Sequence, residues 1–192
     1  MNQAIARAIS IFGHPMLVLP LAAIVLALAQ GHDRVALWMA VGFAAFAALV
    51  MGYSSWQVRR GHWAHVDASG QGERKSLNRF LLVVLTLSAA LAFWSGAPRE
   101  LALGLALSAL MVLVAIRTAR WWKLSLHMAF VVYAALLLLQ VAWWASLLGL
   151  AFAAAVAWSR LHLQRHVPRD LVAGACTGAL AGIALTVASR GW

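Results

Sequence analysis

Long apolar runs separated by short polar connections make up most of the chain. The runs that could cross a bilayer as helices are Pro15–Gln30, Val35–Tyr53, Phe80–Ser95, Leu101–Ile116, Met128–Trp158 and Leu171–Ala188. A bilayer core about 30 Å thick needs roughly 20 helical residues, and interfacial Trp, Arg and Lys side chains can extend a shorter run. Because no stretch alternates between apolar and polar residues as a barrel strand does, the pattern predicts an all-α polytopic membrane helix bundle.

The run Met128–Trp158 is too long for one crossing, since as a single helix it would measure about 46 Å. Extended back to Trp121 and forward to Leu163, it gives two spans with a turn near Gln140–Ser146. The Trp143-Trp144 pair would then lie in the far interface, where indole rings prefer to lie. We therefore expect seven transmembrane helices, or six if the first is not a full span.

The whole chain, residues 1–192, is expected to form a single membrane-embedded domain. Within it, residues 1–53 form an N-terminal helix pair and residues 54–192 carry the candidate motifs. The segment Met1–Gly13 lacks a convincing cleavage site, so we interpret it as part of a retained first helix. Gly174, Gly178 and Gly182 recur every four residues, which predicts close helix packing rather than a ligand site.

Composition supports the membrane class, because 64% of residues are hydrophobic and 10% are charged, against about 25% charged in soluble domains. The formal net charge is +10, and most basic residues lie between the apolar runs. The connections Ser54–Arg79, Arg117–His127 and Ser159–Asp170 are each separated by two crossings, so they share one face with the N-terminus. The positive-inside rule favours the cytoplasm for that face, and the opposite orientation stays open because some of these basic residues could serve chemistry instead. We expect an integral protein of a bacterial inner membrane.

The clearest chemical signal lies in Ser159–Asp170. Pro168 suits the first position of the last helix, so Asp170 would lie in its first turn and His166 just outside it. An aspartate four residues after a histidine can accept a hydrogen bond from one ring nitrogen and leave the other free as a nucleophile or base. Free helix-end amides and Arg160 would attract an oxyanion, so the segment predicts a phosphate site.

A second signal lies at the entry to an apolar run, where Lys123, Ser125 and His127 alternate along the chain. Residues two apart share a side of an extended segment, so these three can point together just before the helix begins. Ser125 is also a natural N-cap. A lysine, a hydroxyl and an imidazole at a helix N-terminus form a phosphate cradle with a proton donor.

The third basic segment is a flexible, charged loop that contains glycine and serine and ends in Arg74 and Lys75. Two cations at this position could complete a clamp around a phosphoryl group. They could equally act as topology signals or as anchors to anionic lipid.

The pattern Ser159-Arg160, five residues, His166, three residues, Asp170 resembles the third signature, S-R-x5-H-x3-D, of the type-2 phosphatidic acid phosphatase superfamily. The three basic segments also follow the order of that family's signatures and span about half of the chain. The first two apolar runs contain no part of a signature.

The other two signatures are matched with substitutions. The second, P-S-G-H, is resembled around Ser125, with Leu124 in place of proline and Leu126 in place of glycine. In the first, K-x6-R-P, Arg74 aligns with the arginine, while Asp67 stands where lysine belongs and Lys75 follows where proline belongs.

The resemblance implies a metal-independent lipid phosphate phosphohydrolase that works through a phosphohistidine. By position, His166 would attack phosphorus, Asp170 would orient it, and His127 would protonate the leaving oxygen. The residues implied to hold the phosphoryl oxygens are Arg160, Ser125 and Arg74, with Lys123 or Lys75 replacing the missing lysine. The substrate would be phosphatidic acid, phosphatidylglycerol phosphate or a polyprenyl (pyro)phosphate such as undecaprenyl pyrophosphate. The partners would be this lipid and the bilayer, with no nucleic acid, metal or cofactor.

Other interpretations use the same residues. A non-catalytic lipid-binding membrane protein could retain a degenerate form of this site. A haem protein could use His127 and His166 as axial ligands, although helix ends are unusual places for them. Taken singly, Arg160 and Asp170 are also favourable partners of helix dipoles, and Ser125 is a simple cap.

Overall fold

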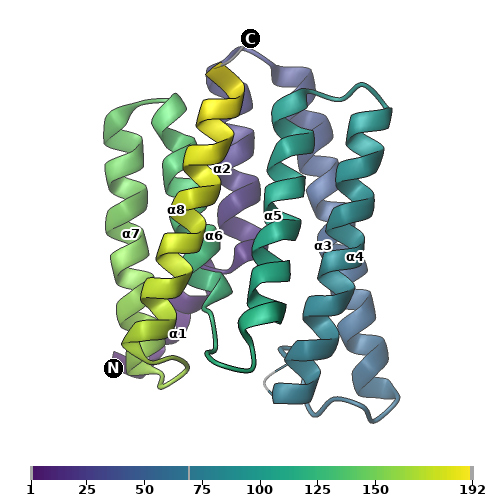
Figure 1. Cartoon of the computed structure of the whole chain (residues 1–192), viewed down its shortest axis with the longest axis vertical. Coiled ribbons are helices and arrows are strands. Elements are labelled where there is room, and N and C mark those ends of the chain that lie inside the picture. The colour runs from purple at the N-terminus through teal and green to yellow at the C-terminus, as the bar shows by residue number, and fades with distance from the viewer. Residues whose placement is uncertain (1, 69, 191–192) are drawn as a thin grey trace. The chain divides into compact units, whose positions relative to one another are not determined.

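The computed structural model describes residues 2–68 and 70–190, which form helices joined by short connections (Figure 1). The elements in this part of the chain are α1 (Asn2–Phe12), α2 (Pro15–Ala29), α3 (Asp33–Arg59), α4 (Gln71–Trp94), α5 (Arg99–Thr118), α6 (Leu126–Leu137), the 3-10 helix η1 (Leu138–Gln140), α7 (Trp143–His162) and α8 (Pro168–Arg190). The predicted all-α class is confirmed.

Five of these helices, α3, α4, α5, α7 and α8, are long and apolar enough to cross a membrane. A sixth span results if α1 and α2, which are bent by 53° at their break, count as one. Large apolar side chains are widely exposed, among them Phe93 at 79% and Trp94 at 92%. Such surfaces suit lipid and are avoided in water. The upper count of six agrees with the lower end of the predicted range, but the helix that falls short of a span is α6 rather than the first.

The run Met128–Trp158 is divided as predicted, with a break at Val141–Ala142 inside the predicted turn. The predicted extension back to Trp121 is wrong, because α6 begins only at Leu126. The hydroxyl of Ser125 accepts a hydrogen bond from the third amide beyond it and so caps the helix there. Together α6 and η1 cover only 15 residues, from Leu126 to Gln140, fewer than the roughly 20 needed for a full crossing.

The chain divides into two compact units, and each is described by itself. The first comprises Met1–Ala40 and Thr118–Trp192, and the second comprises Val41–Arg117. The first unit therefore combines both ends of the chain. The predicted single domain, with residues 1–53 as an N-terminal pair, stays a prediction.

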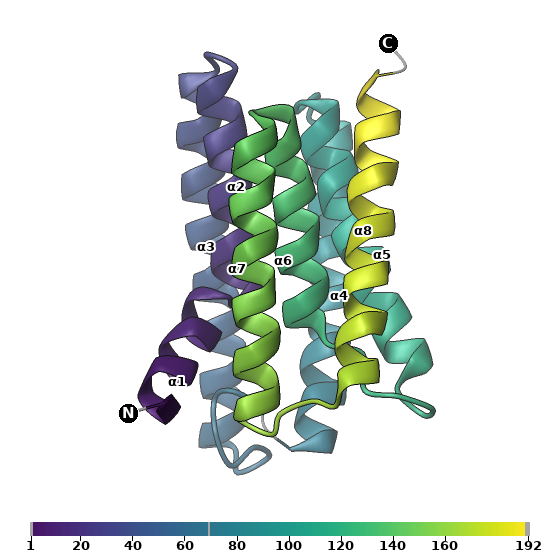
Figure 2. The same cartoon turned by 90° about the vertical axis from the view of Figure 1, so that its left-hand side faces the viewer.

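In the first unit, α6 is the central helix and contacts α2, α7 and α8 (Figure 2). Nine of its 12 residues are buried. Because neighbours surround it, α6 is apolar on all sides, as a helix in the middle of a bundle must be. The core around it consists of Met128, Val131, Val132, Ala153, Val156 and Leu171.

The glycine series of α8 provides the closest of these helix contacts. A β-carbon on Gly174 would collide with the carbonyl oxygen of Ser125, and one on Gly178 would collide with that of Ala129. Gly182 likewise faces a side chain of α6. The predicted role of the series in close packing is confirmed, since only residues without a side chain let two helix backbones approach this far.

In the second unit, α3 and α4 are joined by aromatic and polar contacts. The rings of Tyr53 and Phe80 stack with centroids 3.9 Å apart, and the hydroxyl of Tyr53 lies 2.7 Å from Ser76 Oγ. Gln57 donates a hydrogen bond of 2.8 Å to the same Tyr53 hydroxyl. Tyr53 therefore connects the two helices through both its ring and its hydroxyl.

We expect Gly178→Ala to lower the free energy of unfolding by about 1–3 kcal/mol, because the added methyl group must push α8 away from the Ala129 carbonyl. Gly42→Ala is the matched control, since a β-carbon on Gly42 meets nothing within 4 Å and alanine favours helix. Thermal unfolding of both variants in detergent micelles measures the difference. Equal stability of the two variants would contradict the packing role.

Candidate functional site

The start of α8 places the predicted His–Asp pair together. Pro168 is the first residue of α8, so Asp170 lies in its first turn and His166 just before it, as the sequence predicts. His166 Nδ1 lies 3.5 Å from Asp170 Oδ2, and both side chains are only 6% exposed. The same carboxylate oxygen accepts a hydrogen bond from the backbone amide of Val167 at 3.4 Å. The carboxylate therefore faces the Nδ1 side of the imidazole, which leaves Nε2 as the nitrogen able to act as nucleophile.

The start of α6 joins this pair through the backbone. The amide of Ser125 donates a 3.1 Å hydrogen bond to the carbonyl oxygen of Asp170. Ser125 is fully buried, and its hydroxyl caps α6 by accepting from the amide of Met128. Just before it, Lys123 Nζ donates a 2.8 Å hydrogen bond to the carbonyl oxygen of Arg165, in the connection that carries His166. The connections Arg117–His127 and Ser159–Asp170 are therefore brought together.

The end of α7 supplies Arg160, which is held by the N-terminal helix. Arg160 Nη1 donates a 2.9 Å hydrogen bond to Ser10 Oγ. The neighbouring Ser159 is buried, and its hydroxyl donates a 2.7 Å hydrogen bond to the carbonyl oxygen of Ala6. These contacts position the guanidinium at the same end of the unit as the starts of α6 and α8.

His127 is the second residue of α6, so it lies inside the first helical turn rather than in the extended segment with Lys123. Its ring packs edge-to-face against that of His14, with centroids 5.1 Å apart and planes at 87°. His14 is the residue that caps α2, immediately before Pro15. His14, from the N-terminal part of the chain, thus contacts His127, which is one of the predicted site residues.

The positive charges near the starts of α6 and α8 affect the protonation of the neighbouring histidine rings. Arg160 is an electrostatic neighbour of His14, His127 and His166. Burial, followed by the charges of Arg160 and Lys123, lowers the pKa of His166 from 6.5 to about 4, although Asp170 acts in the opposite direction. The His166 imidazole is therefore neutral at pH 7, the state in which a ring nitrogen can attack phosphorus.

Three buried polar atoms of the cluster make no hydrogen bond, namely Arg160 Nε, His166 Nδ1 and Asp170 Oδ1. Asp170 Oδ1 has a 3.8 Å approach to Arg169 Nε. A buried polar group without a hydrogen bond costs about 1–3 kcal/mol, so these three atoms give the cluster hydrogen-bonding capacity that its own residues do not use.

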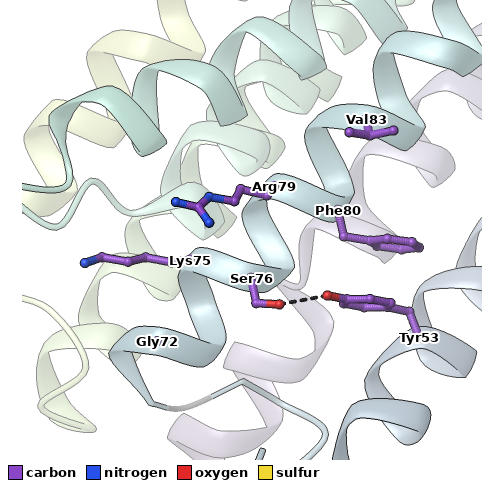
Figure 3. Close-up of a pocket in the computed structure, with 7 residues that line it drawn as sticks. All are labelled: Tyr53, Gly72, Lys75, Ser76, Arg79, Phe80 and Val83. Carbon is purple, nitrogen blue, oxygen red and sulfur yellow. Dashed lines mark hydrogen bonds between the residues drawn. The ribbon is translucent and has the colours of Figure 1, made fainter. Parts of the chain in front are cut away.

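Arg74 and Lys75 belong to the second unit, in the first two turns of α4. Lys75 lines a groove together with Arg79, Tyr53 and Phe80. Figure 3 shows Lys75 and Arg79 extending from α4 on the side away from the two aromatic rings. Their predicted part in holding the phosphoryl group stays a prediction.

Sequence reasoning missed the contribution of the N-terminal segment, above all His14 and Ser10. One signal was available, because a histidine directly before Pro15 opens the first apolar run and marks a helix cap. Nothing in the sequence, however, pairs that cap with residues more than a hundred positions away. Within the described residues, no group of three or more His, Cys, Asp or Glu side chains is arranged to hold a metal ion.

Comparisons of the chain with protein-family models, with curated proteins and with solved structures found no match.

In the protein without substrate, we expect the His166 ring to titrate with a midpoint near pH 4, well below the ordinary 6.5. Arg160→Gln should raise this midpoint, because it removes a positive charge that disfavours the imidazolium. Ring ¹⁵N chemical shifts followed against pH report the protonation state directly. Arg120→Gln is the control, since the Arg120 guanidinium lies over the ring of Trp121 and is not among the charges that act on His166. A wild-type midpoint at or above 6.5 would contradict this electrostatic description.

Proposed function

We propose that the chain is a metal-independent lipid phosphate phosphohydrolase that acts through a phosphohistidine intermediate. The observation that carries the proposal is the buried His166 side chain, 3.5 Å from Asp170 and beside the charges of Arg160 and Lys123. A nucleophile, an orienting carboxylate and fixed positive charge are the parts that phosphoryl transfer requires. The resemblance of these residues to the third signature of the type-2 phosphatidic acid phosphatase superfamily supports the same assignment.

In the first step, the Nε2 lone pair of His166 attacks phosphorus. A P–N bond forms and the P–O bond to the lipid breaks. His127, protonated once the negative charge of the substrate phosphate lies beside it, donates a proton to the leaving oxygen. Asp170, whose Oδ2 lies 3.5 Å from the other ring nitrogen, stabilises the positive charge that develops on the His166 ring. Arg160 and Lys123 stabilise the phosphoryl oxygens.

In the second step, water attacks the phosphohistidine. His127, now neutral, takes a proton from the water as the P–O bond forms and the P–N bond to His166 breaks. Inorganic phosphate leaves, His166 is neutral again, and His127 is ready to protonate the next leaving group. No proton or electron is left over in the cycle.

The position of the site supports the proposed substrate class. His166 lies in the connection between α7 and α8, at the ends of helices that are long enough to cross a bilayer. A site at such helix ends is level with lipid headgroups, so a phosphate can reach it while its acyl or prenyl chain stays in the bilayer. Phosphatidic acid, phosphatidylglycerol phosphate and polyprenyl (pyro)phosphates all fit this requirement.

We propose further that the site faces the cytoplasm of a bacterial inner membrane, because of the excess of basic residues on its face. In a Cys176→Ala background, Gln30→Cys should react with an impermeant maleimide on intact cells. Trp121→Cys should react only after permeabilisation. Gln30 follows the end of α2 opposite His14, whereas exposed Trp121 precedes the start of α6. The reverse labelling pattern would place the site outside.

Purified protein should release phosphate from these lipids in the presence of EDTA, and His166→Ala should lower the rate by at least about a thousandfold, since it removes the nucleophile. His162→Ala is the matched control, because His162 is exposed and stacks on Trp158 with ring centroids 5.2 Å apart. Its rate should stay close to that of the wild type. Lipid binding without phosphate release would favour the non-catalytic lipid-binding alternative.

The intermediate gives an independent test. Protein quenched during turnover of ³²P-labelled lipid should carry a label that is stable in base and lost in acid, as a phosphoramidate bond requires. The label should be absent from His166→Ala and retained in His162→Ala. A labelled His166→Ala protein would assign the nucleophile to another residue.

A further inference from the structure

The N-terminal segment of the chain lies against the proposed site although it contains no part of the three signatures. Helix α1 packs on α7, and it contacts both residues that begin the third signature, Ser159 through Ala6 and Arg160 through Ser10. After Gly13 the chain turns by 53° into α2. His14 lies at this turn, between the two helices.

The backbone fixes the conformation of His14. Its Nδ1 accepts a 3.2 Å hydrogen bond from the amide of Met16, and Pro15 occupies the first helical position after it. A nitrogen that accepts a hydrogen bond carries no hydrogen, so the neutral ring of His14 has its hydrogen on Nε2. His14 is therefore a capping residue with a defined tautomer and a defined ring direction.

This ordered ring touches the residue that the proposed reaction uses as its acid. The centroids of His14 and His127 are 5.1 Å apart, and their planes are nearly perpendicular. Among the described residues, no hydrogen bond holds the imidazole of His127, so the ring contact with His14 restricts its orientation. His14 is exposed, whereas the His166 side chain is 6% exposed, which places His14 at the outer edge of the cluster.

We infer that His14 is a positioning residue for the leaving-group step: its ring holds the His127 imidazole so that the proton of His127 reaches the oxygen of the departing lipid. This inference rests on the proposed function and adds to it a residue outside the three signatures. Proton transfer depends steeply on geometry, because donor and acceptor must come within hydrogen-bond distance of each other.

A positioning role for the acid makes the effect of His14 depend on the leaving group. An aliphatic alcohol, as in a lipid phosphate, leaves poorly unless its oxygen is protonated. The phenolate of p-nitrophenyl phosphate leaves without a proton. Loss of His14 should therefore slow the cleavage of lipid phosphate much more than that of p-nitrophenyl phosphate, whereas general damage to the site would slow both.

The experiment compares kcat and KM for phosphatidic acid and p-nitrophenyl phosphate in wild type, His14→Asn and His14→Phe. Asparagine keeps a side-chain cap for α2 but lacks the ring, while phenylalanine keeps a ring beside His127 but lacks the cap. For phosphatidic acid we expect kcat to fall by about tenfold or more in His14→Asn, with KM changed by less than about threefold, and to be partly restored in His14→Phe. For p-nitrophenyl phosphate, both variants should stay within about threefold of wild type. Thermal unfolding in detergent verifies that each variant is folded, and His162→Ala is again the control.

Three results would overturn the inference. An equal fall in kcat with both substrates would assign His14 a general structural role. An unchanged kcat with both would show that His14 has no part in the reaction. A fall as large in His14→Phe as in His14→Asn, with both variants folded, would show that the ring itself is not what positions His127. Failure of the proposed function looks different, because the wild-type protein would then release phosphate from neither substrate.

Discussion

The close approach of α6 and α8 is the contact on which the rest of the first unit depends. Gly174 and Gly178 let the backbone of α8 come against the carbonyl oxygens of Ser125 and Ala129. At this separation the amide of Ser125 reaches the carbonyl of Asp170. A side chain at either glycine would separate the helices and, with them, the two segments whose residues form the candidate site.

The same close packing buries charged groups of the candidate site next to one another. The side chains of His166 and Asp170 are almost completely buried beside the cation Arg160, and several of their polar atoms lack hydrogen bonds. Such an arrangement costs stability and lowers the pKa of His166. Under the proposed function, the substrate phosphate supplies negative charge and hydrogen-bonding atoms to this cluster.

Local features of the site were readable from the sequence because each depends on neighbouring residues. Ser125 as a helix cap, Pro168 at the first position of α8 and the break between Gln140 and Ser146 all follow from short-range chemistry. The predicted start of α6 at Trp121 was too early, because it relied on hydropathy, which is also a local signal. Apolar Trp121 and Trp122 extend the hydrophobic run backwards, whereas the N-cap at Ser125 makes the helix begin only at Leu126.

By itself, the sequence determined the membrane class, the approximate helices and the spacing of His166 from Asp170, because hydropathy and helical geometry act within a few residues. Only the tertiary structure decided that α1 contacts Arg160, that His14 lies against His127, and that α6 is a short central helix surrounded by neighbours. The first two of these contacts join residues more than a hundred positions apart. They depend on how the helix surfaces pack together, which no local pattern of residues encodes.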